Sequence, residues 1–131
     1  MREYLREAPD TAFIFGAMFA GDNTRRGVVQ EWNKQTGKKK AHQQKREIDF
    51  LSHLRGEVIQ GMSPVMLEHM MVRWVCCDVD QKIDPKVFCS KLWVYDQSLF
   101  PFKSLNGRWH VYKFFDDWTD VKEAKKIAKN I

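Results

Sequence analysis

The sequence has few of the features that define several classes of protein. Among its 131 residues there is no run of about eighteen or more uncharged apolar residues, so we expect no membrane-spanning helix. The first ten residues, MREYLREAPD, are charged and lack the apolar middle of a secretory signal peptide. Internal repeats and low-complexity linkers are also missing. These absences favour a cytoplasmic protein.

Cysteine is scarce, and its three occurrences do not form a pattern. The residues are Cys76, Cys77 and Cys89. Adjacent residues of a strand point to opposite faces, so the first two suit neither one metal ion nor a simple disulfide. No Cys-x-x-Cys pair is present, and the histidines at positions 42, 53 and 69 have no ligand spacing. We therefore expect reduced, partly buried thiols and no zinc site.

What the chain does contain is enough apolar surface for a core. Its composition is 44% hydrophobic and includes nine Phe and five Trp, and its length favours one domain. We expect an N-terminal α/β part over residues 1–71 and a second part over 72–131. In the first part, residues 11–20 indicate a strand or short buried element, 41–54 a helical face, and Ser63-Pro64 the start of another helix. The Met residues 62, 66, 70 and 71 would lie on a buried face of that helix.

The second part has clearer local signals. Residues 72–79 predict a buried strand, and Asp84-Pro85 predicts a helix with an Asp N-cap and Pro at its first position. Asn106-Gly107 is the strongest hairpin signal and joins two strands, LFPFKSL and RWHVYKFF. A last amphipathic helix follows Asp120. This order of elements predicts an α+β fold with a mixed or antiparallel sheet and flanking helices.

Positive charge is concentrated in one segment. The net charge is +5 and the pI about 9.2, which is a weak indication of a polyanionic partner. Residues 34–46, KQTGKKKAHQQKR, carry six cationic side chains. They form either a solvated loop leading into a helix or a surface that contacts nucleic-acid phosphates. The candidate phosphate contacts are Lys38, Lys39, Lys40, Lys45 and Arg46.

Two carboxylates end the predicted strand in VCCDVD. Residues i and i+2 of a strand share a face, so Asp78 and Asp80 would lie side by side. Carboxylates so close repel each other unless a cation lies between them, and hard oxygen ligands suit Mg²⁺ or Mn²⁺. Such pairs are typical of phosphoryl and nucleotidyl transfer. The alternative is that the two residues begin a polar turn.

A second candidate cluster is KSLNGRWHVY. Ser104 and His110 flank a Gly-containing turn, and Lys103 and Arg108 add positive charge. Backbone N–H groups and cations of such a hairpin can surround a phosphate. His110 would share a face with Tyr112 and Phe114, and Lys113 would lie on the opposite face. The alternative is an ordinary hairpin. The Trp residues 74, 93 and 109 fit a core better than a base-stacking surface.

Together, VCCDVD and SLNGRWHVY resemble the archaeo-eukaryotic primase superfamily, which includes primase-polymerases of phages and plasmids. The first segment is similar to the family's h-h-D-h-D metal motif, at Asp78 and Asp80. The second is similar to its Ser-to-His motif, at Ser104 and His110. The resemblance implies an RRM-like catalytic core, Mg²⁺ or Mn²⁺, nucleoside triphosphates and nucleotidyl transfer on a single-stranded DNA template. A helicase domain or protein would be a further partner.

The chain departs from this family at the third acidic motif. The acidic residues after the His strand, at 116, 117, 120 and 123, are in the wrong place for it. The chain would then be a fragment of a longer primase-polymerase or an incomplete copy. A second hypothesis is a non-catalytic nucleic-acid-binding replication accessory module. A metal-dependent nuclease fits less well, because it would not need the Ser-to-His turn.

Overall fold

The structure, a computed structural model, describes residues 9–104 and 107–131. Over these residues the protein is α+β, as the order of elements predicted, with two antiparallel three-stranded sheets and four helices. The chain divides into two compact units, one ending at Met70 and the other spanning Met71–Ile131. Within the described residues, every helix is too short or too polar to cross a membrane.

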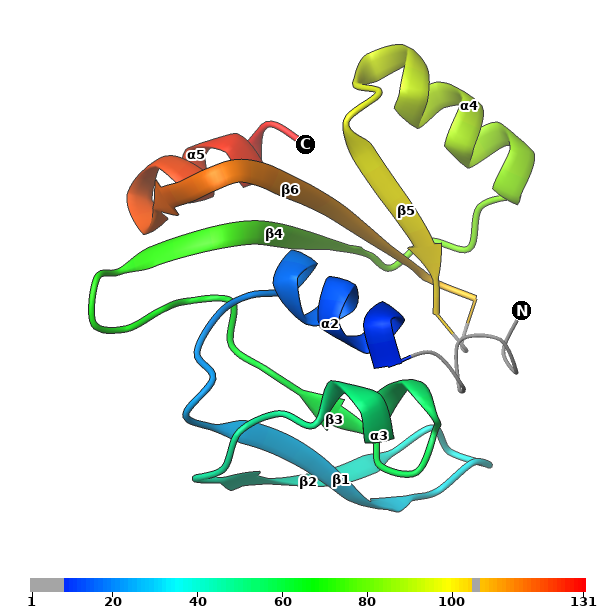
Figure 1. The fold of residues 1–131 in the computed structure, drawn as a ribbon. Helices are drawn as coiled ribbons and strands as arrows, with labels where there is room; N and C mark the ends of the chain where they lie inside the picture. The colour runs from blue at the N-terminus through cyan, green and yellow to red at the C-terminus, as the bar shows by residue number, and fades with distance from the viewer. Residues whose placement is uncertain (1–8, 105–106) are drawn as a thin grey trace. The chain divides into compact units, whose positions relative to one another are not determined.

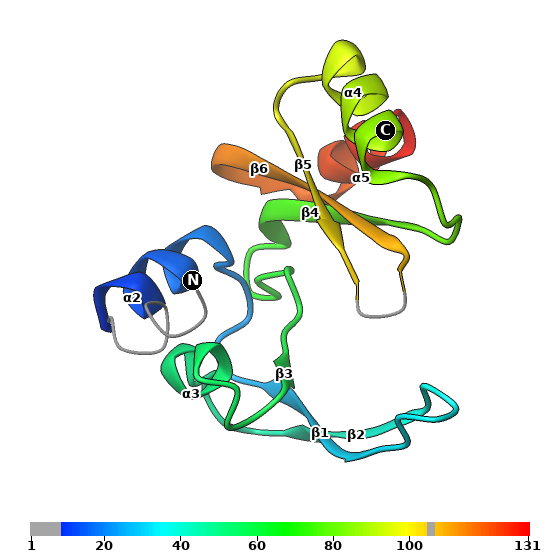
Figure 2. The same cartoon turned by 90° about the vertical axis from the view of Figure 1, so that its right-hand side faces the viewer.

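The first unit contains one of the sheets and two helices. Its described elements are α2 (Pro9–Met18), β1 (Arg26–Trp32), β2 (Lys39–Gln44), α3 (Phe50–Leu54) and β3 (Gln60–Gly61). The sheet has the order β2-β1-β3, with antiparallel pairing throughout. The helices contact each other through Phe15 and Phe50, whose ring centroids are 5.9 Å apart. Figure 2 shows α2 and α3 side by side.

Several predictions for this unit were wrong. Residues 11–20, expected as a strand or short buried element, lie mostly in helix α2. Its apolar residues surround the helix, with Phe13 80% and Ile14 59% exposed, so no helical period marks one face. The helix expected over 41–54 is reduced to α3, because the preceding residues pair with β1 as strand β2. Strand pairing, which is non-local, overrides the local helical pattern here.

The helix predicted after Ser63 is also absent. Residues 63–70 form turns and a bridge, and Met70 has a positive φ of 52°. Ser63 still resembles a cap, since its Oγ accepts a hydrogen bond from the Val65 amide at 3.3 Å. The methionines at 62, 66, 70 and 71 therefore do not form a buried helix face, and Met70 is 50% exposed.

The second unit follows its predicted course closely. Its elements are β4 (Met71–Val79), α4 (Pro85–Tyr95), β5 (Leu99–Lys103), β6 (Trp109–Asp120) and α5 (Val121–Lys129). The strand order is β4-β6-β5, with both pairs antiparallel. Both helices lie on the same side of this sheet (Figure 1), since Phe88 of α4 stacks on Trp109 and Cys77 contacts the Ala128 carbonyl of α5.

Local capping explains where the two helices of this unit begin. The Asp84 carboxylate accepts hydrogen bonds from the Lys86 and Val87 amides, with Pro85 in the first turn. Asp120 caps α5 in the same way, through the amides of the second and third residues after it. The hairpin between β5 and β6 is present as predicted, and Gly107 has a φ of 78°, a conformation that suits glycine. Asn106, the other half of that signal, lies outside the described residues.

The core of the second unit lies between the sheet and its helices. Leu99, Val111 and Trp109 are at most 4% exposed, and all three face α4 and α5. Lys113 shares this face, as predicted, and its Nζ donates to Asp96 Oδ2 at 2.8 Å. The hydrogen bond from Lys113, together with those from Ser98, lowers the pKa of Asp96 to about 2. The charge of Lys113 at the core edge is therefore paired.

We expect Leu99→Ala to lower the free energy of unfolding by about 2–5 kcal/mol, because a fully buried side chain leaves a cavity. The matched control is Val94→Ala on α4, where the side chain is 89% exposed and the change should stay within about 0.5 kcal/mol. Urea unfolding followed by tryptophan fluorescence measures both. Equal losses from the two substitutions would contradict the assigned core.

Candidate functional site

The pairing of β4 with β6 brings the two candidate motifs together. Asp78 lies directly opposite His110 in the register, and the two side chains point to the face of the sheet away from the helices. His110 Nε2 is 3.5 Å from Asp78 Oδ1. Both side chains remain open to solvent, with 44% of the histidine and 76% of the aspartate exposed. Residues 32 positions apart in the sequence therefore meet at one end of the sheet.

The hairpin turn adds two further predicted residues to the same end. Arg108 Nη1 donates to Asp80 Oδ1 at 3.1 Å. The Ser104 amide donates to the Arg108 carbonyl at 2.8 Å, and Ser104 Oγ accepts from the Arg108 amide at 3.2 Å. The serine thus supports the turn that presents Arg108. The pairs Asp78–His110 and Asp80–Arg108 thus lie at the same end of the sheet, and together we call these four residues the hairpin cluster.

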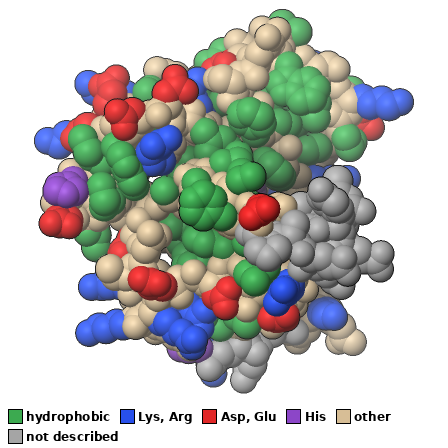
Figure 3. Space-filling view, viewed as in Figure 1, with side chains coloured by type: hydrophobic (Ala, Val, Ile, Leu, Met, Phe, Trp, Pro, Cys, Tyr) green, Lys and Arg blue, Asp and Glu red, His purple; other side chains and the backbone are tan. Residues whose placement is uncertain are grey.

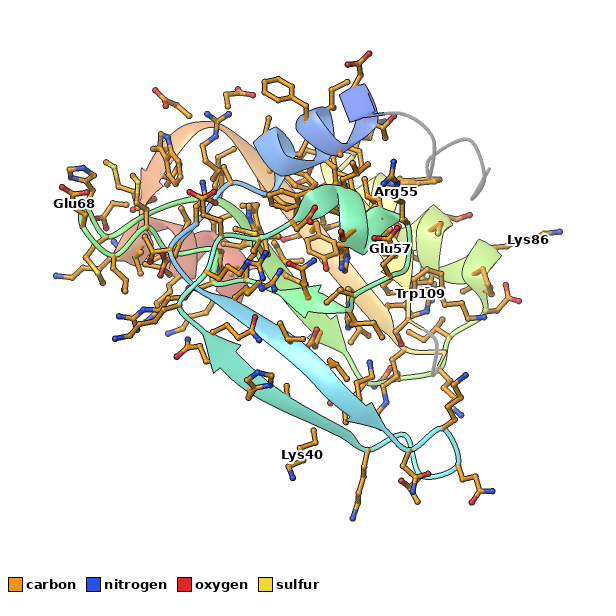
Figure 4. The ribbon with its side chains drawn as sticks, turned by 60° about the horizontal axis from the view of Figure 1, so that its bottom comes forward. Lys40, Arg55, Glu57, Glu68, Lys86 and Trp109 are labelled. Atoms are coloured by element: carbon orange, nitrogen blue, oxygen red, sulfur yellow. The ribbon has the colours of Figure 1, made fainter. Side chains whose placement is uncertain are left out.

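The other predicted cations lie elsewhere. Lys103 is opposite Trp109 in the register, so its strand position faces the helices rather than His110. Lys38, Lys39, Lys40, Lys45 and Arg46 are exposed on the hairpin of β1 and β2 in the first unit. In Figure 4 the side chain of Lys40 points away from β2 into solvent. The middle of this segment is strand β2, and only Lys45 and Arg46 lie in a loop that leads into helix α3, so the predicted loop is shorter than expected.

A row of aromatic side chains continues from the hairpin cluster over the same face of the sheet. Tyr112 lies within 6.4 Å of His110, 6.1 Å of Phe114, 5.4 Å of Phe102 and 5.8 Å of Trp74, measured between ring centroids. The predicted face-sharing of His110, Tyr112 and Phe114 is confirmed. Of the three tryptophans expected in the core, those at 74 and 109 are buried, whereas Trp93 is 49% exposed.

This apolar surface changes the acidity of two neighbouring groups. All three cysteines are free, and Cys76 lies opposite Tyr112, one row from Asp78. Desolvation, with a smaller contribution from the Asp78 charge, raises the pKa of the Cys76 thiol to about 11. Desolvation also raises the pKa of Tyr112 to about 12, helped by Cys76 and Asp78. Both groups are therefore neutral at pH 7. The sequence analysis assigned neither residue to a site.

The side chains of the hairpin cluster supply only some of the ligands that a bound divalent cation needs. Across residues 9–104 and 107–131, no group of three or more His, Cys, Asp or Glu side chains is placed to hold a metal ion. Mg²⁺ is often held by one or two carboxylates, with water and substrate phosphates completing its shell. Asp78 and Asp80, 76% and 81% exposed, could supply such a pair. These two carboxylates could therefore hold a cation only together with a phosphate ligand.

Large apolar side chains remain at the surface of both units, as the green areas of Figure 3 illustrate. On α4, Val94 is 89% and Tyr95 63% exposed, and on β5, Phe100 and Phe102 are 48% and 53% exposed.

Comparison of the chain with protein-family models, with curated proteins and with solved structures found no match. The function therefore has to be argued from the hairpin cluster itself.

The shifted pKa of Cys76 is directly testable. In a Cys77→Ser/Cys89→Ser background, we expect iodoacetamide to modify Cys76 at pH 8 about 100-fold more slowly than a free cysteine, because about 100-fold less thiolate is present. Adding Asp78→Asn should accelerate the reaction, since the carboxylate raises this pKa. Asp116→Asn, a change near the other end of β6, is the control and should have no effect. Modification as fast as that of free cysteine would refute the placement of Cys76.

Proposed function

We propose that the hairpin cluster is a metal-dependent nucleotide site, and that the chain is a catalytic domain, or part of one, that performs nucleotidyl transfer on a single-stranded DNA template. The observation that carries this proposal is the contact between the two motifs. Asp78 lies against His110 at 3.5 Å, and Asp80 lies against Arg108 at 3.1 Å. Two carboxylates and two side chains that can donate hydrogen bonds to a phosphate thus lie at one end of one sheet.

The topology of the second unit supports the primase-polymerase resemblance. The element order β4-α4-β5-β6-α5 and the strand order β4-β6-β5 correspond to a β-α-β-β-α-β motif without its last strand. The RRM-like core has that motif. In it, the last strand pairs with the first, and the outer edge of β4 is unpaired among the described residues. The third acidic motif of the family would belong to such a strand.

The chemistry assigned to each residue follows from its type and position. Asp78 and Asp80 would hold Mg²⁺ or Mn²⁺, which neutralises phosphate charge and favours attack on the α-phosphate. Arg108 can donate two parallel hydrogen bonds to a phosphate. Its present partner is a mostly exposed carboxylate, and exposed ion pairs contribute only about 0–1 kcal/mol. Exchanging Asp80 for a triphosphate would therefore cost Arg108 little, and His110 can donate to a neighbouring oxygen.

A second candidate function is a non-catalytic nucleic-acid-binding accessory module. The observation that favours it is the exposed basic hairpin of the first unit, together with the lack of a third metal donor among the described residues. Both hypotheses predict salt-dependent binding of single-stranded DNA, because Lys and Arg displace counterions from phosphates. Only the first predicts that nucleotide binding depends on a metal ion and on the two aspartates.

Calorimetric titration with a nucleoside triphosphate, with and without Mn²⁺, tests the proposed site. For the wild-type chain we expect binding that requires the metal, because the aspartates alone would repel the phosphates. Asp78→Asn/Asp80→Asn should weaken this binding at least about tenfold, since it removes both anionic ligands. The matched control is Asp116→Asn/Asp117→Asn, which removes the same charge from two exposed positions near the far end of β6.

Metal-dependent binding by the wild-type and control chains, lost in the Asp78/Asp80 variant, would support the proposal. Binding that is unchanged by Mn²⁺ and by both double variants would contradict it. In that case the accessory-module hypothesis predicts that single-stranded DNA still binds. That binding would weaken when Lys38, Lys39 and Lys40 are changed to Gln.

A further inference from the structure

A buried arginine lies in the first unit, outside the hairpin cluster. Arg26 begins the central strand β1 and is only 8% exposed. Its Nε donates to Gln44 Oε1 on β2 at 3.0 Å, and its Nη1 donates to Gln60 Oε1 on β3 at 2.8 Å. The side chain therefore connects all three strands of the sheet. Both acceptors are neutral amides.

The charge of this guanidinium has no directly bonded carboxylate, although Arg26 lies near enough to Asp49 to help lower the pKa of that side chain. Among the described residues, no carboxylate lies within 4.0 Å of Arg26, although buried charges are normally paired. A guanidinium has five N–H donors, and two are bonded here. Its remaining donors make no hydrogen bond to a described residue. Leaving a buried cation unpaired is costly, so this site favours an anion.

A cavity of about 390 Å³ lies beside Arg26, within the size range of roughly 300–1,000 Å³ typical of small-molecule sites. Its wall includes Arg25 and Ser63, as well as two glycines, Gly27 and Gly61. Glycines allow a ligand to approach the backbone closely. The cavity lies entirely on residues of the first unit.

Asp22 also lines the cavity, and its carboxylate is already engaged. Its Oδ1 accepts from the Thr24 amide at 2.9 Å and from the Thr24 hydroxyl at 2.5 Å. These bonds, aided by the charge of Arg25, lower the pKa of Asp22, so it remains anionic. The two arginines and this aspartate leave a net charge of +1 on the wall. Gly21 lets this turn approach Ser63, because a Cβ there would meet the Ser63 carbonyl oxygen at 2.3 Å.

We infer that the cavity beside Arg25 and Arg26 binds a phosphate group. A tetrahedral oxyanion matches the unbonded donors of a buried guanidinium, and a second arginine lines the same cavity. The inference is independent of the hairpin cluster, because it uses no residue of the second unit. The phosphate could belong to a nucleotide, to a nucleic-acid backbone or to the free ion.

The competing explanation is that Arg26 only ties the strands together. That role would be filled by the two hydrogen bonds to Gln44 and Gln60 alone. It would not require the second arginine at the cavity, which makes no hydrogen bond to the strands among the described residues. Arg25 therefore separates the two explanations, and it is exposed enough for substitution without loss of the fold.

The test is an NMR titration of the full chain with inorganic phosphate, at an ionic strength kept constant with sodium chloride. We expect saturable shifts at the Gly27, Gly61 and Ser63 amides. Arg26→Gln should weaken binding at least about tenfold and Arg25→Gln several-fold, because each removes a charged donor. Arg55→Gln, which removes the same charge from an exposed position outside the cavity, is the control and should bind as the wild type does.

Competition then identifies the source of the phosphate. If a single-stranded oligonucleotide displaces inorganic phosphate whether or not the oligonucleotide carries a 5′-phosphate, the site binds the nucleic-acid backbone. If only the 5′-phosphorylated oligonucleotide displaces it, the site binds a terminal phosphate. No shift at these amides, or equal affinity in all four proteins, would overturn the inference. If Arg26→Gln fails to fold, the comparison of Arg25→Gln with Arg55→Gln still decides. Loss of metal-dependent nucleotide binding at Asp78 and Asp80 would leave this result unaffected.

Discussion

The register between β4 and β6 is the constraint on which the candidate site depends. A slip of one residue would turn Asp78 and its alternate neighbours toward the helices and bury them among apolar side chains. The residues on the other face of β4 oppose such a slip, since the partly buried Val75 and Cys77 would then leave the side of the sheet that the helices cover. The caps at Asp84 and Asp120 fix where the helices leave the sheet. The same packing that stabilises the unit therefore sets Asp78 opposite His110.

Burial explains why the charges of Arg108 and Arg26 have different surroundings. Arg108 is more than half exposed and pairs with an exposed carboxylate, so its partner can be exchanged at little cost. Arg26 is buried and hydrogen-bonded to neutral amides, with no carboxylate within 4.0 Å among the described residues, so its charge favours a bound anion. The first arrangement suits a ligand that arrives and leaves. The second suits a ligand that stays bound.

The sequence predicted the second unit well because its signals are local. An Asp-Pro cap, a Gly-containing turn and the alternation over residues 109–114 each depend on a few neighbouring residues. Those signals also placed Asp78, Asp80, Ser104 and His110 near the ends of strands, and the antiparallel pairing of β6 with both β4 and β5 brought them together. The metal and nucleotide roles of these residues stay predictions.

The first unit was harder to predict because non-local contacts decide its structure. Helix α2 is apolar all round and gives no period, and residues of β2 adopt strand geometry through pairing with β1. Nothing in the local sequence marks Arg26 as buried, because the glutamines that bond it lie 18 and 34 residues away. Only the strand order β2-β1-β3 brings those side chains to one place.

The most direct test of the central claim, that Asp78, Asp80, Arg108 and His110 form one nucleotide and metal site, is paramagnetic broadening of backbone amide signals by Mn²⁺ with a nucleoside triphosphate. The account predicts that the amides of residues 78–80 and 108–110 broaden first. The amide of Asp117, about 23 Å along β6 from His110 at roughly 3.3 Å per residue, should broaden last among these. Broadening confined to one of the two segments, or equal at Asp117, would show that the two motifs do not form a common site.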